Sequence, residues 1–187
     1  VEVGVGLIPG GAGTKEFALR ASDAFHKEET HIPILIDKFK TIAMASVSTS
    51  ASKAYNEGYL RKGQDRICLN TTRTLAEAKR EVLSLAAAGY IQPAPRQDIY
   101  VLGQTGLGAL YVAAESLRLG KYASDHDITI AKKVAYVLCG GDLSAPQLVS
   151  EQYLLDIERE AFLSLCGEQK TLERIQAMLT TGRPLRN

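Results

Sequence analysis

The residues best placed to do chemistry lie at the start of the chain. Glu2 stands in an apolar stretch, residues 1–8, that carries no other ionisable side chain. A turn rich in glycine follows this stretch, and its members are Pro9, Gly10, Gly11 and Gly13. Burial beside an apolar pocket raises the pKa of a carboxyl group toward neutral pH, where the group can act as a general acid or base. On residue types alone, the alternative is an ordinary strand and tight turn with an exposed glutamate.

The spacing of these residues resembles a known signature. Glu2, Gly6, Pro9, Gly10 and the Gly-x-Gly-Thr of residues 11–14 resemble the P-E-x-x-x-G-x-x-P-G-x-G-G-T pattern of the crotonase (enoyl-CoA hydratase/isomerase) superfamily. The same turn does not meet the P-loop pattern, because the lysine follows the threonine instead of preceding it. The turn is therefore interpreted as a crotonase-type turn and not as a phosphate cradle.

Further segments are similar to the same family. Ser50–Leu60 looks like the family's S-A-x-x-A-x-x-x-G-L-V helix and turn, and residues 158–187 look like its C-terminal helices. Residues 47–51 and 151–168 look like one branch, the bifunctional 3-hydroxyacyl-CoA dehydrogenase/enoyl-CoA hydratase of fatty-acid β-oxidation, whose hydratase module is C-terminal. Because position 1 is not Met and the chain opens inside an expected strand, we expect a C-terminal fragment of such a protein.

The resemblance implies a fold, an activity and site residues. The fold would be mainly α with little β, as the C-terminal part of a crotonase-like fold with an enlarged helical lobe. The activity would be addition of water to a trans-2-enoyl-CoA, with Glu2 as one of two catalytic glutamates. The substrate-binding residues would be Pro9, Gly10, Gly11 and Gly13, whose turn brings the backbone close to the substrate. The other glutamate and the oxyanion amides would lie upstream, so the isolated fragment is expected to be inactive.

Two alternatives to hydration stay open at this point. An isomerase of the family needs only one glutamate at the position of Glu2, and the helical lobe could instead have a non-catalytic packing or oligomerisation role. The partners implied are an acyl-CoA thioester, the upstream dehydrogenase domain of the same polypeptide, and a second copy in a homo-oligomer. We expect no cofactor in this fragment, and NAD only in the absent dehydrogenase domain.

Composition narrows the class of protein. A formal net charge of +1 gives no field that would recruit nucleic acid or a membrane surface, and no apolar run is long enough for a membrane span. His26, His31 and His126 have neither i, i+4 spacing nor companion cysteines, so we expect no metal site and place all three at the surface. The cysteines have no C-x-x-C spacing and favour a reducing, cytoplasmic location. They are Cys68, Cys139 and Cys166.

Helical periodicity dominates the rest of the chain. A helix is expected from a Thr74–Glu77 capping box to a left-handed glycine at position 89, and Thr14 and Ser124 are placed to cap two others. Further apolar stripes predict helices over residues 107–119, 124–139 and 171–181, and another along the stripe of residues 154–165, closed by Gly167. Strands are expected at residues 1–7, 66–69 and 99–102. Because the prolines in residues 92–98 forbid a regular helix, that segment is the expected linker between domains 1–90 and 98–187.

Overall fold

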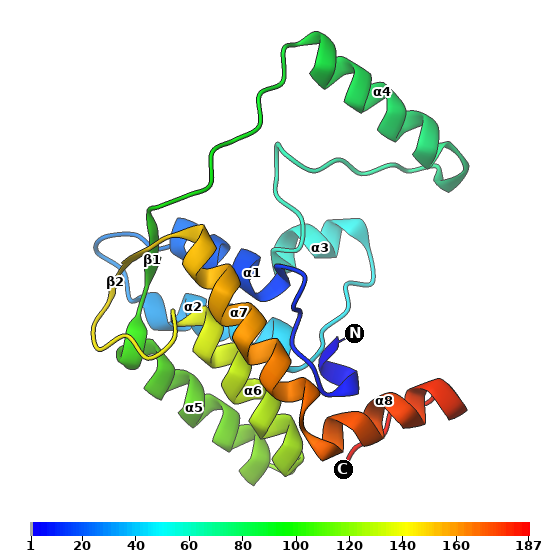
Figure 1. Ribbon diagram of the computed structural model, residues 1–187. Helices are drawn as coiled ribbons and strands as arrows, with labels where there is room; N and C mark the ends of the chain where they lie inside the picture. Colours follow the sequence, from blue (N-terminus) through cyan, green and yellow to red (C-terminus); the bar gives the residue numbers. More distant parts are fainter. Residues whose placement is uncertain (1) are drawn as a thin grey trace. The chain divides into compact units, whose positions relative to one another are not determined.

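The computed structural model describes residues 2–187 and divides the chain into two compact units (Figure 1). Unit 1 consists of the residues up to Val47 together with Arg96–Asn187, and unit 2 consists of Ser48–Pro95. This grouping differs from the expected domains 1–90 and 98–187. The first two helices pack against helices from the second half of the chain, so they share a core with those helices.

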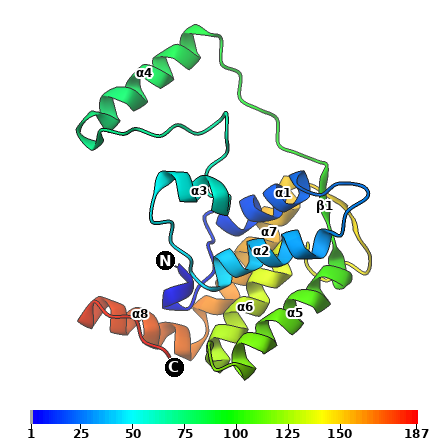
Figure 2. The ribbon, with the colours of Figure 1, turned by 180° about the vertical axis from the view of Figure 1, so that it is seen from behind.

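Unit 1 is a cluster of helices around one central helix. Its elements in chain order are η1 (Glu2–Val5), α1 (Gly13–Asp23), α2 (His31–Ala43), β1 (Ile99–Val101), α5 (Gly103–Leu119), α6 (Asp125–Leu138), β2 (Gln147–Val149), α7 (Glu151–Cys166) and α8 (Gln169–Thr181). Helix α6 packs against α1, α2, α5 and α7 (Figure 1). Seen from behind, α1 and α2 lie over α6 (Figure 2). The core of unit 1 is therefore centred on α6.

Local sequence explains why α6 begins where it does. The Ser124 hydroxyl accepts a hydrogen bond from the Asp127 amide, and the Asp127 carboxylate accepts one from the Ser124 amide, which forms a capping box. Eight of the fourteen residues of α6 are buried, as expected for a helix covered on several sides. The predicted cap at Ser124 is confirmed, and so is the apolar stripe of this helix.

Within residues 2–187, the β-structure is confined to one short pair of strands. Strands β1 and β2 are antiparallel, with Ile99 opposite Val149. The strand expected at residues 99–102 is confirmed, whereas the strand expected at residues 66–69 is wrong. The strand expected at residues 1–7 is wrong over residues 2–7, and its residue 1 lies outside the described residues. At the N-terminus η1 stands in place of a strand, and it ends in a Schellman-type cap: the amides of Gly6 and Leu7 donate to the carbonyls of Val3 and Glu2, with Gly6 at φ +92°. The expectation of a mainly α protein with little β is confirmed.

Unit 2 contains α3 (Ala51–Glu57), η2 (Thr71–Arg73) and α4 (Thr74–Ala87). The Gly89 amide donates to Ala86 and the Tyr90 amide to Leu85, and Gly89 has φ +79°, which together form a Schellman cap. The glycine stop at position 89 is thus confirmed. The Thr74–Glu77 capping box is wrong, because η2 precedes the helix and Asn70 caps that turn instead.

Within unit 2, the apolar face of α4 is exposed. No residue of this helix is buried, and Leu75 is 84% exposed.

Among the described residues, no helix is both long and apolar enough to cross a membrane.

Candidate functional site

The glycine-rich turn enters α1 without a cap of its own. Ala12 is the N-cap residue, with φ 71° in the left-handed region, and its side chain accepts no capping hydrogen bond. Thr14 is the second residue of the helix, and its hydroxyl donates to the Pro9 carbonyl at 3.3 Å. The prediction that Thr14 caps α1 is therefore wrong. The free amides of the first helical turn must be satisfied by another group.

Glu158 of α7 is that group. The Ala12 amide donates to Oε1 of Glu158 and the Lys15 amide donates to Oε2, both at 2.7 Å. The Glu158 side chain is 1% exposed, so water does not compete for these bonds. A carboxylate at a helix N-terminus satisfies orphan amides and meets the positive end of the helix dipole. Glu158 thus caps α1 from a helix far away in sequence.

Burial governs the protonation of Glu158. Desolvation raises the pKa of its carboxyl group above the ordinary glutamate value, and the backbone amides of the turn oppose this shift by binding the ionised form. The net direction is upward. Glu158 is therefore a carboxyl group with a perturbed pKa, which is a property of functional sites as well as of structural networks.

A buried lysine completes the network. Lys15 is 4% exposed, and its Nζ atom lies 2.7 Å from Glu16 Oε1 and 2.6 Å from Glu151 Oε1. Burial alone would lower the pKa of Lys15, but its hydrogen bonds to the two carboxylates raise it. The bond from Lys15 lowers the pKa of Glu151, whose other oxygen accepts from the Arg96 amide at 3.2 Å. Lys15 therefore stays charged inside the protein.

The glycines of the turn are fixed by neighbouring helices. A Cβ atom at Gly10 would overlap the Phe162 ring of α7, and one at Gly13 would lie 2.7 Å from Cβ of Pro9. At Gly6, which has φ +92°, a Cβ would come 2.7 Å from the Thr171 hydroxyl oxygen of α8. A Cβ at Gly11 would meet nothing within 4 Å. Close packing against α7 and α8 is thus sufficient reason for the glycines at positions 6 and 10.

The predicted site residues do not all enter this network. Glu2 lies exposed in η1, and Gly10 and Gly11 are exposed in the turn. Pro9 and Gly13 are half-buried, and the carbonyl of Pro9 accepts from the Thr14 amide at 3.2 Å. The catalytic role of Glu2 and the substrate-binding role of the turn stay predictions. The structure does show that the Ala12 and Lys15 amides bind Glu158 and not a ligand.

Glu158 itself was missed by reasoning from sequence. It follows Leu154 by four residues and Ile157 by one, so it falls on the apolar stripe that was used to predict α7. An acidic residue in a buried stripe needs a partner, because an unpaired buried charge is costly. The acidic side chain of Glu158 within an apolar stripe was therefore the sequence feature that could have indicated a buried, paired carboxylate.

A second buried polar cluster joins α6 to α8. His126 is 3% exposed, so the prediction of a surface histidine is wrong at this position. Its Nε2 atom lies 2.9 Å from the hydroxyl oxygen of Thr171, which donates to the Gly6 carbonyl at 2.9 Å. The Thr171 hydroxyl proton is thus used, so Nε2 of His126 is the donor in the first bond. Burial, followed by the nearby Arg174 charge, lowers the pKa of His126.

Metal and thiol chemistry have little support in the described part of the chain. Residues 2–187 contain no group of three or more His, Cys, Asp or Glu side chains that could hold a metal ion. The three cysteines are free, and burial raises the pKa of the Cys139 thiol to about 12. Cys139 is therefore protonated and inert at neutral pH.

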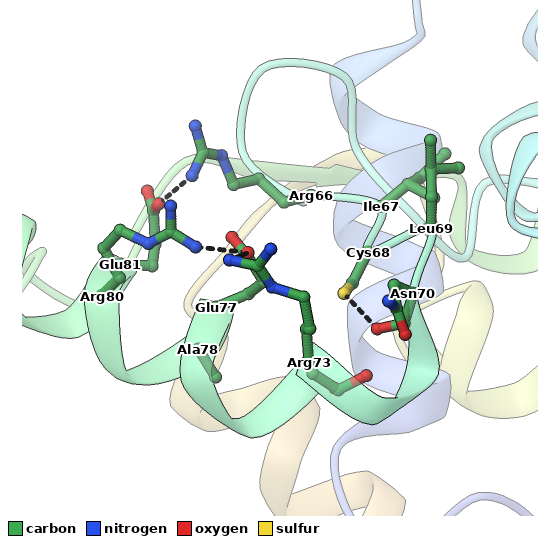
Figure 3. Close-up of a pocket in the computed structure, with 11 residues that line it drawn as sticks. Arg66, Ile67, Cys68, Leu69, Asn70, Arg73, Glu77, Ala78, Arg80 and Glu81 are labelled. Carbon is green, nitrogen blue, oxygen red and sulfur yellow. Dashed lines mark hydrogen bonds and ion pairs between the residues drawn. The ribbon is translucent and has the colours of Figure 1, made fainter.

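Unit 2 carries an open hollow of about 770 Å³ beside α4 (Figure 3). Its arginines are engaged with neighbouring carboxylates: Arg66 pairs with Glu81, and Arg80 pairs with Glu77. The Cys68 thiol donates to the Asn70 carbonyl at 3.1 Å. Arg73 also lines the hollow and lies 3.6 Å from the same Glu77 carboxylate that pairs with Arg80, so three arginines meet two glutamates and the lining has one excess positive charge.

The chain was compared with known proteins. No family model and no solved structure matches it. It is 46% identical over 189 residues to a probable 3-hydroxyacyl-CoA dehydrogenase of Bacillus subtilis (strain 168). The chain is homologous to a segment of that protein. The match covers 100% of this chain but only 23% of the relative.

This relative overturns the hydratase interpretation. Its name describes a dehydrogenase and mentions neither a hydratase nor an isomerase. The prediction of an enoyl-CoA hydratase module, offered with an isomerase module or a packing region as alternatives, is therefore wrong. The part of the prediction that named a 3-hydroxyacyl-CoA dehydrogenase agrees with the relative's name. The crotonase-like fold stays a prediction.

Proposed function

We propose that this chain is part of an enzyme that oxidises 3-hydroxyacyl-CoA thioesters with a nicotinamide cofactor. One observation carries the proposal: 46% identity to a probable 3-hydroxyacyl-CoA dehydrogenase extends over all of this chain. Identity at that level over a whole segment favours the same fold and a shared role in the larger protein. The substrate class of the proposal is an acyl-CoA thioester.

In this proposal the dinucleotide binds to another part of the polypeptide. A dinucleotide site places its pyrophosphate on the free amides of a helix that follows a parallel strand. In the described residues the two strands form an antiparallel pair, and Glu158 takes amides of the glycine-rich turn before α1. The residues present do not fit a dinucleotide, so the upstream dehydrogenase domain remains the expected partner. The free cysteines agree with a cytoplasmic enzyme.

The test is a chimera. In the Bacillus subtilis relative, the 23% of the protein that matches this chain is replaced by residues 1–187. The chimera and the unchanged relative are assayed for NADH formation from 3-hydroxybutyryl-CoA and from a longer 3-hydroxyacyl-CoA. We expect the chimera to retain oxidation with a kcat within about ten-fold of the relative, a loss of no more than about 1.4 kcal/mol in activation free energy.

A matched variant separates folding from function in this assay. Glu160→Ala changes an exposed glutamate on α7 and should leave the chimera unaffected. Glu158→Ala removes the cap of α1 and should lower activity in step with stability. A folded chimera that forms no NADH beside an active relative would refute the proposal, as would a relative that lacks the activity.

A further inference from the structure

A second hollow lies entirely within unit 1 and differs in character from the one on α4. It has a volume of about 210 Å³ and forms where η1, the end of α2, the turn between α5 and α6, and the C-terminal tail meet. Val3, Leu117 and Ile128 give it apolar walls, and Val3 and Ile128 are themselves buried in the core. The hollow is thus built from segments that are distant in sequence.

Its size limits the ligand. A dry protein cavity of about 150 Å³ holds benzene, which has six non-hydrogen atoms. Scaled by volume, about 210 Å³ accommodates roughly eight non-hydrogen atoms, fewer than a drug-sized ligand needs. An apolar chain of about six carbons with a small polar head has this size.

Charge decides the nature of the head group. Arg174 also lines the hollow, but its guanidinium is occupied: it binds Asp127 at 2.7 Å, Ser124 at 3.2 Å and the Asn187 side chain at 2.9 Å. This pairing neutralises Asp127, the acidic residue of the lining. Arg186 lies exposed in the C-terminal tail, and no hydrogen bond or ion pair joins it to another described residue. The hollow therefore offers one uncompensated positive charge beside apolar walls.

The rim is held in position by the backbone. Ala45 lines the hollow with φ 49°, and Lys121, next to the rim residue Tyr122, has φ 60°. Left-handed conformations at residues other than glycine persist only where the surroundings impose them, and they concentrate at functional sites. Met44 and Tyr122 are the exposed apolar side chains of this rim.

We propose that this hollow binds a short-chain carboxylate of about six carbons, with its chain against Val3, Leu117 and Ile128 and its carboxylate paired with Arg186. The volume, the apolar walls and the unpaired arginine favour this ligand whether or not the chain belongs to a dehydrogenase. Arg186 is the ligand's charge partner, because a guanidinium binds a carboxylate through parallel hydrogen bonds.

A methionine methyl group can report ligand binding to this hollow by NMR. Of its two methionines, Met44 lies on the rim, and Met178 lies in α8 outside the hollow. With ¹³C-methyl methionine, hexanoate is titrated into the 187-residue chain and both methyl signals are followed. We expect a saturable shift of Met44, with an apparent Kd of roughly 1–10 mM for a ligand of this size, and no shift of Met178. Equal shifts of both signals, or none, would overturn the proposal.

Ligand analogues and protein variants then test the two parts of the site, which are the charge partner Arg186 and the apolar hollow. Hexanol should bind about two- to five-fold more weakly than hexanoate, the range of an exposed ion pair, and hexylammonium should bind more weakly than hexanol. Arg186→Gln should weaken hexanoate binding by the same factor, whereas Arg183→Gln, in the same tail but outside the hollow, should not. Gly4→Leu should obstruct the hollow, because Gly4 lines it and a Cβ there would meet no atom within 4 Å.

Gly108→Leu adds the same side chain on α5, at another glycine with open space, and should leave binding intact. Equal binding of hexylammonium, equal loss in the two arginine variants, or unchanged binding by folded Gly4→Leu would each contradict the proposal. If Gly4→Leu fails to fold, the Met44 and Met178 titration of the wild-type chain still decides the outcome.

Discussion

Removing the Glu158 carboxylate should destabilise unit 1 by an amount that the structure lets us estimate. Glu158→Ala leaves the buried Lys15 amide and the partly buried Ala12 amide without this acceptor. Each such amide costs about 1–3 kcal/mol, and losing an N-cap typically costs about 1 kcal/mol. Relief of the buried charge offsets part of this sum, so we expect a loss of about 2–5 kcal/mol in the free energy of unfolding. Glu158→Gln keeps one acceptor oxygen and should lie between the wild type and the alanine variant.

Urea denaturation followed by circular dichroism measures these differences, provided that the transition is two-state and the m-value does not change. Glu160→Ala is the matched control, because it makes the same substitution at an exposed position of α7 and should change stability by less than about 0.5 kcal/mol. If Glu158→Ala and Glu160→Ala have the same stability within error, Glu158 does not cap α1 and the assignment of the turn as a structural element is wrong.

Three further predictions concern single side chains. Because the folded-state pKa of His126 is depressed, its contribution to stability is complete above about pH 6.5 and is lost as the pH falls through the folded pKa. Denaturation at a series of pH values should show this loss in the wild type and a smaller loss in His126→Gln. Equal pH profiles of the two proteins would contradict the prediction. Gly10→Ala should lower stability by about 1–3 kcal/mol through overlap with the Phe162 ring, whereas Gly11→Ala should be nearly neutral, so the reverse order in thermal melting would refute the packing argument. The Cys139 thiol should resist a thiol reagent at pH 8 until the chain unfolds, while Cys68 and Cys166 react first; early modification of Cys139, located by mass spectrometry, would be the contrary result.

Local sequence predicted the elements whose stability is local. Helix α6 has its capping box at Ser124 within its own sequence, and the end of α4 is set by Gly89. Both features depend on residues within a few positions of one another, so periodicity and capping rules find them. They were found.

Elements that depend on distant partners were missed. The cap of α1 comes from Glu158, 146 positions from Ala12, so no local pattern could identify it and Thr14 was chosen instead. The alternation of residues 1–7 predicted a strand, but residues 2–5 form a 3₁₀ helix, which the amides of Gly6 and Leu7 end by donating to the carbonyls of Val3 and Glu2. His126 looked like a surface residue because its partner Thr171 lies 45 positions away.

The candidate site shows the same division. The sequence predicted that the glycine-rich turn brings the backbone close to a substrate, and this role stays a prediction. What approaches Gly10 and Gly6 is Phe162 and Thr171 of this chain, which the sequence alone could not reveal. The glycines therefore have a structural explanation that needs no substrate, and the roles predicted for Glu2 and for the turn in binding still await a direct test.

The most direct measurement is the rate of NADH formation from a 3-hydroxyacyl-CoA by three proteins: the Bacillus subtilis relative, the same protein without the segment that matches this chain, and the chimera in which residues 1–187 replace that segment. If the chain is part of a 3-hydroxyacyl-CoA dehydrogenase, the chimera should have a kcat/KM within about ten-fold of the relative and well above the deletion variant. A chimera that folds but is no more active than the deletion variant would contradict that role.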